Sequence, residues 1–284
     1  MQSTQVTGHL YIVATPIGHL DDITLRAADV LKSVQIIAAE DTRRSRILLN
    51  RLGAEQVRMI SLHEHNEEEL LPQLLDKMQS GIDVALVSDA GTPLICDPGF
   101  KLVRAAWDRG IQVLPVPGCS AIMAAVSICP LPVDRFYFEG FLPAKASQRV
   151  KRLQSLAASI DVALVFFESP RRILACLEDL ITVVGKERRI MIGRELTKIH
   201  ETVTCGPVLE VLAQLNRNES RGEFVCVLEA PAAQPNDMKD VRELVTILSS
   251  ELKPSQAARL AAKYTGMSRA RLYALAQSVK SEVS

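Results

Sequence analysis

The chain has 284 residues, with 33 Lys and Arg against 33 Asp and Glu and a hydrophobic fraction of 48%. The zero formal charge excludes a global basic excess, so any nucleic-acid surface has to come from local clusters of Lys and Arg. A chain of this length is long for one hydrophobic core, and two domains with a small appendage are expected.

The six cysteines lie far apart, form no C-x-x-C pair and match no zinc-site spacing with the five histidines. We therefore expect buried, reduced thiols and no bound metal, although His63 and His65 are close in sequence. No apolar run reaches the ~18–20 residues that cross a bilayer, and no positively charged segment precedes the first apolar stretch. These features favour a cytoplasmic protein.

In the first half of the chain, short apolar strands alternate with amphipathic helices, which predicts a doubly wound, mostly parallel α/β sheet. Strands are expected at 10–14, 34–39, 57–62, 84–87 and 111–116. Asn66 and Glu69 have the spacing of a capping box. Loops rich in Pro and Gly follow three strands, at 15–20, 88–93 and 117–121, and the carboxyl ends of parallel strands are where such sheets bind ligands.

The stretch 84–100, VALVSDAGTPLICDPGF, contains a buried strand, a loop with one carboxylate and a flexible glycine, and a second turn, Asp97-Pro98-Gly99. It is a candidate ligand loop, although such loops also join strands to helices without a chemical role. After the second strand, Glu40 and Asp41 precede Arg43, Arg44 and Arg46. The alternative for this segment is a solvated helix start with acids near its N-terminus.

A second α/β unit is expected after the linker at 130–132. Its strands are predicted at 135–140, 162–167, 189–194 and 222–229, with a helix at 208–215. Ser169 and Pro170 suit an N-cap and first helical position. A local basic patch has no acid near it in sequence and consists of Lys145, Arg149, Lys151 and Arg152.

Helices are predicted after a second linker, at 230–236, and two of them flank T-G-M-S as in a helix-turn-helix. The basic residues here include Arg259, Lys263, Arg269 and Arg271, and no acid lies between 253 and 280. This segment either contacts nucleic acid or forms a capping or dimerising hairpin. The expected domains are 1–129, 130–231 and 237–284.

The chain contains no Walker loop, G-x-S-x-G elbow, H-E-x-x-H or G-x-G-x-x-G motif. Spacing alone therefore indicates only an α/β enzyme that binds a small ligand between two domains.

Seven motifs, taken in chain order, allow a more specific interpretation of the function. They are YIVATPIGHLDDIT, AAEDTRRS, SDAGTPLICDPGF, PVPGCSA, FFESPRRI, GRELTKIHE and GEFVCVLE. Together they resemble the tetrapyrrole methylase superfamily, and more narrowly its RNA-modifying branch, over nearly the whole chain. The resemblance implies two α/β domains with a cofactor cleft between them, a C-terminal helical domain and a homodimer. It also implies transfer of a methyl group from S-adenosylmethionine to the ribose 2′-OH of a cytidine in the decoding region of 16S rRNA, in the small ribosomal subunit.

By the same resemblance, residues from both domains hold the cofactor: Pro16, Ile17, Asp89, Ala90, Gly91, Thr92, Leu94, Ser120, Ala121, Phe167, Leu196 and Glu223. Phe167 and Leu196 are equally consistent with plain core positions. The alternative for Asp89 and Thr92, which we favour less than a ligand role, is a satisfied turn.

A ribose hydroxyl is a weak nucleophile, so the enzyme has to align it and help to remove its proton. The candidate bases are Asp41, and Lys198 if burial lowers its pKa; the alternative is that positioning alone suffices. Arg43, Arg44 and Arg46, the patch at 145–152 and the basic tail are expected to contact RNA phosphates. The alternatives are a methyltransferase of the same fold acting on a porphyrin-like small molecule, and a ligand-sensing regulator whose terminal helices dock on DNA.

Overall fold

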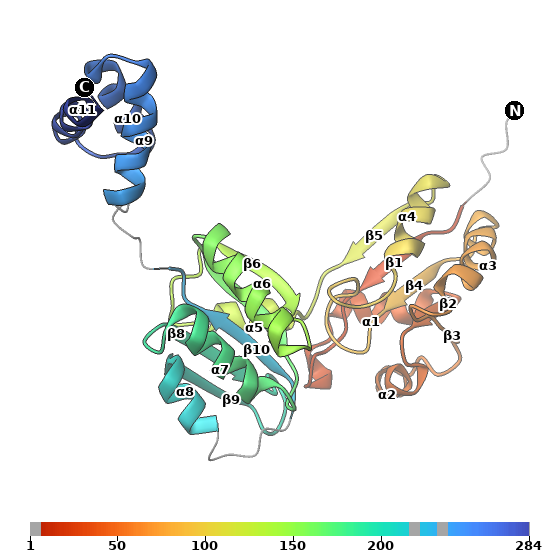
Figure 1. The fold of residues 1–284 in the computed structure, drawn as a ribbon. Coiled ribbons are helices and arrows are strands. Elements are labelled where there is room, and N and C mark those ends of the chain that lie inside the picture. The colour runs from red at the N-terminus through yellow and green to blue at the C-terminus, as the bar shows by residue number, and fades with distance from the viewer. Residues whose placement is uncertain (1–6, 216–221, 232–237, 284) are drawn as a thin grey trace, which may run out of the picture. The chain divides into compact units, whose positions relative to one another are not determined.

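The computed structural model describes residues 7–215, 222–231 and 238–283. These fall into two compact units, Met1–Ala230 and Pro231–Ser284. Within the described residues, the first unit contains two five-stranded sheets and the second contains helices α9, α10 and α11 (Figure 1). The linker expected at 230–236 lies mostly outside the described residues.

The first sheet has the strand order β3-β2-β4-β1-β5, and all its pairs are parallel. The strands are β1 (Leu10–Val13), β2 (Ile36–Ala39), β3 (Arg58–Ser61), β4 (Val84–Val87) and β5 (Val113–Val116). The helices are η1 (Leu20–Asp22), α1 (Leu25–Ser33), α2 (Thr42–Leu52), α3 (Glu67–Gln79) and α4 (Phe100–Asp108). The doubly wound parallel sheet is thus confirmed.

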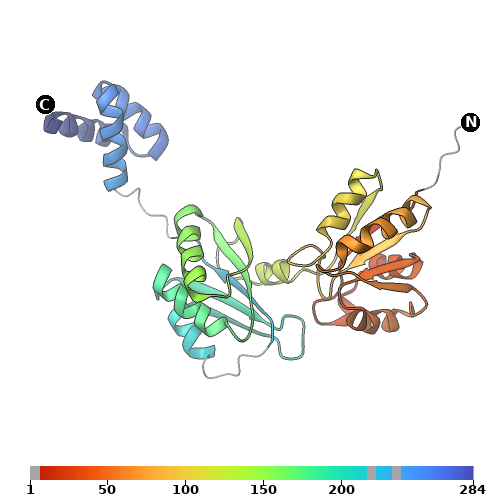
Figure 2. The same ribbon diagram turned by 45° about the vertical axis from the view of Figure 1, so that its right-hand side comes forward.

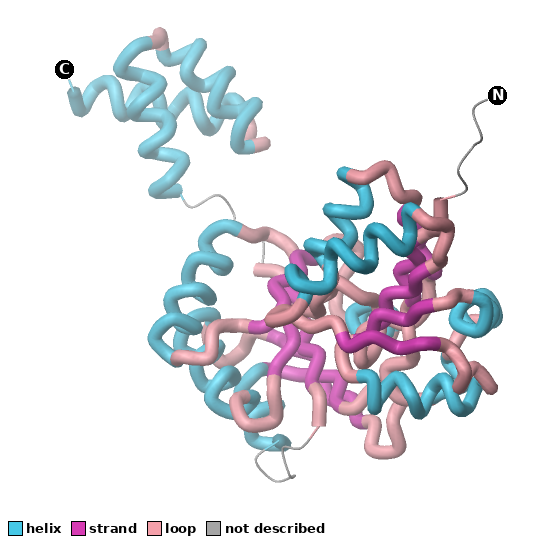
Figure 3. The backbone as a smooth tube through the Cα atoms, turned by 90° about the vertical axis from the view of Figure 1, so that its right-hand side faces the viewer, coloured by secondary structure: helices cyan, strands magenta, loops and turns pink. Residues whose placement is uncertain are grey.

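Helices cover both faces of this sheet (Figure 3). Leu31 of α1 and Leu49 of α2 pack on one face, whereas Leu74 of α3 and Leu102 of α4 pack on the other. Because of this double cover, every residue of β2 and β4 is buried, which explains their unbroken apolar runs.

The second sheet is mixed, with the order β6-β7-β10-β8-β9; β6 and β7 are parallel, and the other pairs are antiparallel. The strands are β6 (Phe136–Phe141), β7 (Ala163–Glu168), β8 (Arg189–Arg194), β9 (Thr202–Pro207) and β10 (Phe224–Leu228). The helices are α5 (Ala121–Ser127), α6 (Ala146–Ser159), α7 (Ile173–Val184) and α8 (Val208–Leu215). The sequence did not predict β9, an edge strand that begins with two exposed residues.

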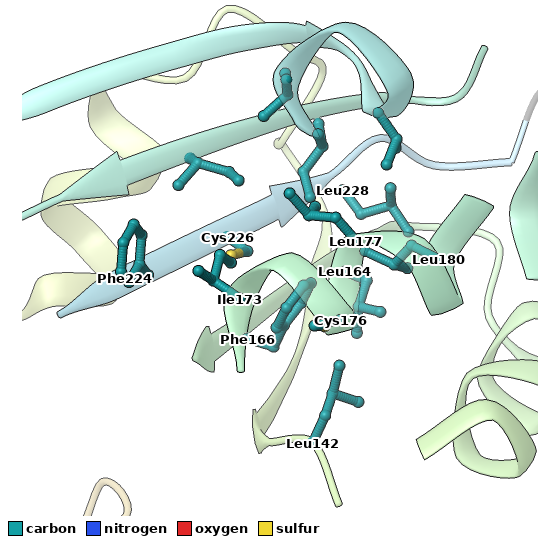
Figure 4. Close-up of a cluster of buried hydrophobic side chains, with 14 of the residues drawn as sticks. Leu142, Leu164, Phe166, Ile173, Cys176, Leu177, Leu180, Phe224, Cys226 and Leu228 are labelled. Carbon is teal, nitrogen blue, oxygen red and sulfur yellow. The ribbon is translucent and has the colours of Figure 1, made fainter. Parts of the chain in front are cut away.

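The core of the second sheet has two sides. On one, Phe166 and Phe224 of the strands pack against Leu177 and its neighbours on α7 (Figure 4). On the other, Ile122 and Ala125 of α5 pack against Val165, Met191, Val225 and Val227. Helix α5 therefore follows the first sheet in sequence but completes the core of the second.

Two helix starts differ from the sequence prediction. The Asn66 side chain makes no capping bond; its Oδ1 accepts from the His63 N–H at 2.8 Å, and its Nδ2 donates to the Ser61 carbonyl. Ser169 does not cap α7 either, because α7 begins at Ile173 with Arg172 as its N-cap. The Ser169 carbonyl instead accepts from the Arg172 and Ile173 N–H groups in a turn before the helix.

The second unit consists, in its described part, of α9 (Met238–Glu251), α10 (Pro254–Thr265) and α11 (Arg269–Val283), drawn in blue in Figure 2. Val245, Ala261 and Leu272 form its shared core. Gly266 ends α10 at φ 70°, which turns the chain into α11 as expected for a helix-turn-helix. Across all described residues, no helix combines the length and apolarity needed to cross a membrane.

Candidate functional site

Three loops at the carboxyl edge of the first sheet are tied to one another. Thr15 and Gly91 exchange two backbone hydrogen bonds, of 2.9 and 3.0 Å. The Thr92 hydroxyl donates to the Cys119 carbonyl at 3.0 Å. Gly91 has φ 84°, which residues with a side chain rarely adopt. The loops therefore form one connected rim at the end of the strands.

Beside this rim lies a cavity of about 380 Å³ that also receives residues of the second sheet. The expected cofactor residues that line it are Ile17, Asp89, Ala90, Gly91, Thr92, Ser120, Ala121, Phe167 and Glu223. The structure therefore brings together residues that are up to about 200 positions apart in the chain.

Three expected cofactor residues do not line this cavity. Leu196 is 7% exposed and belongs to the core beneath α5. Pro16 is buried and lines a smaller cavity of about 60 Å³. Leu94 is half-buried with φ 75° and shapes its loop.

Sequence reasoning missed other lining residues, including Glu40, Ile95, Cys96, Asp97, Phe141 and Glu168. Most of them lie inside the motifs quoted above, next to residues that were chosen. Arg44 also lines the cavity, although it was expected to bind RNA.

Aromatic rings form one wall of the cavity. Phe167 contacts Phe138 edge to face, with ring centroids 5.1 Å apart, and Phe141 at 5.5 Å. Phe141 is 53% exposed, so its ring is only partly covered by the protein. This wall can stack on a flat heteroaromatic ring.

Carboxylates that follow strands of the first sheet also line the cavity. Asp89 pairs with Arg44 at 3.2 Å and accepts the Asp41 backbone N–H at 2.9 Å, which fixes the start of α2 to the central loop. Burial, with the charges of Glu40 and Asp89, raises the pKa of Asp97 to about 6, although a hydrogen bond with Ser88 opposes the shift. Burial and the Asp89 charge likewise raise the pKa of Glu40.

Neither expected base is suited to that role. The Asp41 carboxylate caps α2 and accepts two hydrogen bonds from the Arg43 side chain, which lower its pKa to about 2. Burial lowers the pKa of Lys198, but its hydrogen bonds to Glu223 (2.9 Å) and Glu195 (3.0 Å) outweigh burial, and the net shift is upward. Lys198 is thus a charged ammonium at neutral pH, which corrects the expectation of a lowered pKa.

The expected basic patch at 145–152 is largely neutralised by acids from other elements. Arg149 is 3% exposed and pairs with Asp179 of α7 at 2.6 Å, so it has no free surface for a phosphate. Arg152 makes two bonds to Glu139 of β6, at 2.6 and 2.7 Å. Lys145 and Lys151 remain exposed. The burial and pairing of Arg149 therefore argue against a contact with RNA.

The other expected RNA residues are more accessible. The Arg43 side chain is 90% exposed despite its pairing with Asp41, whereas Arg46 donates to the Glu55 carbonyl at 2.9 Å. In the second unit all four expected RNA residues are exposed: Arg259, Lys263, Arg269 and Arg271.

All six cysteines are free, as expected, but only Cys176 and Cys226 are buried. Burial raises the pKa of Cys176 to about 12, so this thiol stays protonated. Among the described residues, no group of three or more His, Cys, Asp or Glu side chains is placed to hold a metal ion.

Comparison with known proteins places this geometry in a family. A model of the tetrapyrrole (corrin/porphyrin) methylases matches residues 9–212, which span most of both sheets. The chain belongs to the tetrapyrrole methylase family. A second model, the RsmI C-terminal HTH domain, matches residues 236–280. The resemblance seen in the motifs is thus confirmed, together with the fold and the helix-turn-helix.

Relatives within the family match along nearly the whole chain. Ribosomal RNA small subunit methyltransferase I of Escherichia coli O157:H7 is 46% identical over 269 residues, covering 94% of this chain and 93% of the relative. The protein of that name from Xylella fastidiosa (strain Temecula1) is 48% identical, covering 94% of this chain and 98% of the relative.

Solved structures share the fold at low identity. Uroporphyrin-III C-methyltransferase from Thermus thermophilus, complexed with S-adenosylhomocysteine, has a TM-score of 0.56 and 18% identity, covering 78% of this chain and 97% of that one. Diphthine synthase has a TM-score of 0.60 and 17% identity, covering 83% and 95%.

Proposed function

We propose that this methylase transfers the methyl group of S-adenosylmethionine to the ribose 2′-OH of a cytidine in the decoding region of 16S rRNA. The observation that carries the proposal is the joining of a methylase domain to the RsmI C-terminal HTH domain, in a chain whose relatives are named rRNA methyltransferases. The cytidine and its 2′-oxygen come from the resemblance of the motifs.

The residues around the cavity fit the cofactor. The volume of about 380 Å³ lies in the range of small-molecule sites. Phe167 and Phe141 offer an aromatic wall for adenine, and the loop from Asp89 to Thr92 lines the same cavity. When bound, S-adenosylmethionine supplies an electrophilic methyl group on a positively charged sulfur.

The protein has two tasks in this reaction. It has to hold the ribose hydroxyl in line with the methyl group, and it has to keep water from competing for that group. The connected loop rim fixes one side of the cavity, while Glu223, held by Lys198, fixes part of the other. Exposed Arg43 and the basic residues of the second unit supply charge for RNA phosphates.

The first test is transfer of labelled methyl to naked 16S rRNA, to assembled small subunits and to a tetrapyrrole precursor. Digestion to nucleosides should place the label in 2′-O-methylcytidine for at least one rRNA form. Label in the tetrapyrrole alone would reject the RNA substrate while leaving the methylase assignment in place.

A pair of arginine variants tests how the RNA is bound. Arg43→Ala should weaken binding of 16S rRNA and reduce its salt dependence by about one phosphate contact, with S-adenosylhomocysteine affinity unchanged. Arg135→Ala is the matched control, because Arg135 is also exposed and paired with a surface acid, Asp161, yet lies outside the expected RNA residues. Equal loss of RNA and cofactor affinity in Arg43→Ala would contradict this division of roles.

A further inference from the structure

The reaction requires a proton acceptor, and the two residues expected to serve are already engaged. Asp41 is bound by Arg43 and does not line the cavity, and Lys198 is held as an ammonium between two glutamates. The acceptor has to lie in the cavity, be ionised near neutral pH, and be free of an ion pair that consumes its charge.

The cavity-lining carboxylates Asp89 and Asp97 differ in these respects. Asp89 is occupied by Arg44 and by the Asp41 N–H. Asp97 lines the cavity, is half-buried, and makes no ion pair with any described residue. Its neighbours Cys96 (φ 66°) and Gly99 (φ 118°) adopt left-handed conformations. Glycine adopts such a conformation readily, whereas for Cys96 it is strained, so the surrounding structure has to hold the turn that carries this carboxylate.

We propose that Asp97 is the general base that accepts the proton of the ribose hydroxyl. The inference rests on the proposed function. As the ribose oxygen bonds to the methyl carbon, its proton passes to the Asp97 carboxylate, and the electron pair of the breaking carbon–sulfur bond remains on sulfur. Asp97 then releases the proton to water.

The surroundings of Asp97 support this role. Burial and the negative charges of Glu40, at the end of β2, and Asp89, at the end of β4, place its pKa at about 6, while Ser88 opposes the shift. Arg44 of α2 also lines the cavity, and it pairs with Asp89. Asp97 is therefore largely ionised at neutral pH, yet more basic than an ordinary carboxylate, as an efficient base requires.

The decisive experiment measures kcat for methyl transfer to rRNA from pH 5 to 9 in the wild type and in Asp97→Asn. The wild-type kcat should rise with a midpoint near 6, and Asp97→Asn should lose ~10²-fold or more of kcat together with that acidic limb. S-adenosylhomocysteine affinity by calorimetry should change less than threefold. Glu40→Gln should move the midpoint to lower pH, because it removes a charge that raises the pKa of Asp97.

A second measurement does not depend on activity. Carbon-13 NMR of the ligand-free protein should show one aspartate carboxyl that titrates near pH 6 and disappears in Asp97→Asn. Near-wild-type kcat in that variant, an unchanged acidic limb, or loss of cofactor affinity as large as the loss of kcat would overturn the proposal. A wild type that labels no rRNA would instead reject the proposed function.

Discussion

The buried pair of Arg149 and Asp179 allows the correction of the basic patch to be tested quantitatively. Arg149 donates to Asp179 through Nε at 2.7 Å and lies 2.6 Å from it through Nη2. Its Nη1 donates to the carbonyls of Ala144 and Pro143, at 3.3 and 3.5 Å. Arg149→Met would keep most of the apolar stem but leave a partly buried carboxylate and two carbonyls without their donor.

Removal of one partner from a buried ion pair costs about 3–5 kcal/mol. The Asp179 side chain is 19% exposed and can recover some hydration, so the lower end, about 3 kcal/mol, is expected. For a unit of this size that corresponds to a fall in Tm of about 6–12 °C. Urea and thermal unfolding measure both quantities.

Two further variants sharpen this test. Lys151→Met, on the exposed face of the same helix, should change stability by less than about 0.5 kcal/mol. Arg149→Met combined with Asp179→Leu should recover much of the loss, because no unpaired charge remains. If Arg149→Met unfolded like the wild type but bound rRNA more weakly, Arg149 would be an RNA contact and our reasoning would be refuted.

Two other predictions concern Gly99, in the turn after Asp97, and Lys198, which donates to Glu223. Gly99→Ala would place Cβ 2.5 Å from Leu86 Cδ2 at φ 118°, and should destabilise the protein by about 2–4 kcal/mol in urea unfolding. Gly53→Ala (φ 70°, no neighbour within 4 Å) should cost only about 1 kcal/mol, and equal costs would contradict the clash. Because the folded-state pKa of Lys198 is raised, its stabilisation is present below its ordinary pKa of ~10.4 and is lost as the pH rises through the higher folded value. The stability difference between wild type and Lys198→Met should therefore be constant from pH 7 to 10 and shrink above pH 10, whereas a difference that shrank below pH 9 would contradict the upward shift.

The strands buried on both faces were predicted well because burial on both faces requires an unbroken run of apolar residues. Val84–Val87 reads as an unbroken apolar run, and the structure places it at the centre of the first sheet. Strand β9 could not be recognised in this way, because an edge strand with exposed Thr202 and Val203 requires no apolar run.

Errors at charged positions have a different origin. Arg149 looked free because no acid is near it in sequence, but Asp179 reaches it from a helix 30 residues further along the chain. Lys198 was a candidate base only if burial lowered its pKa, but one of its two glutamate partners, Glu223, lies 25 residues further along the chain, next to β10, which pairs with β8. Local sequence indicates which residues carry charge, whereas the tertiary fold decides which charges are neutralised.

The position of α5 limits how this protein can be divided. A gene cut after residue 129, where the strand pattern suggests a boundary, would separate Ile122 and Ala125 from the strands they cover. The downstream fragment would then expose Val165, Val225 and Val227 to water and would be prone to aggregation. Exchange of the two halves between relatives therefore requires a junction before α5, within the loop that also lines the cavity.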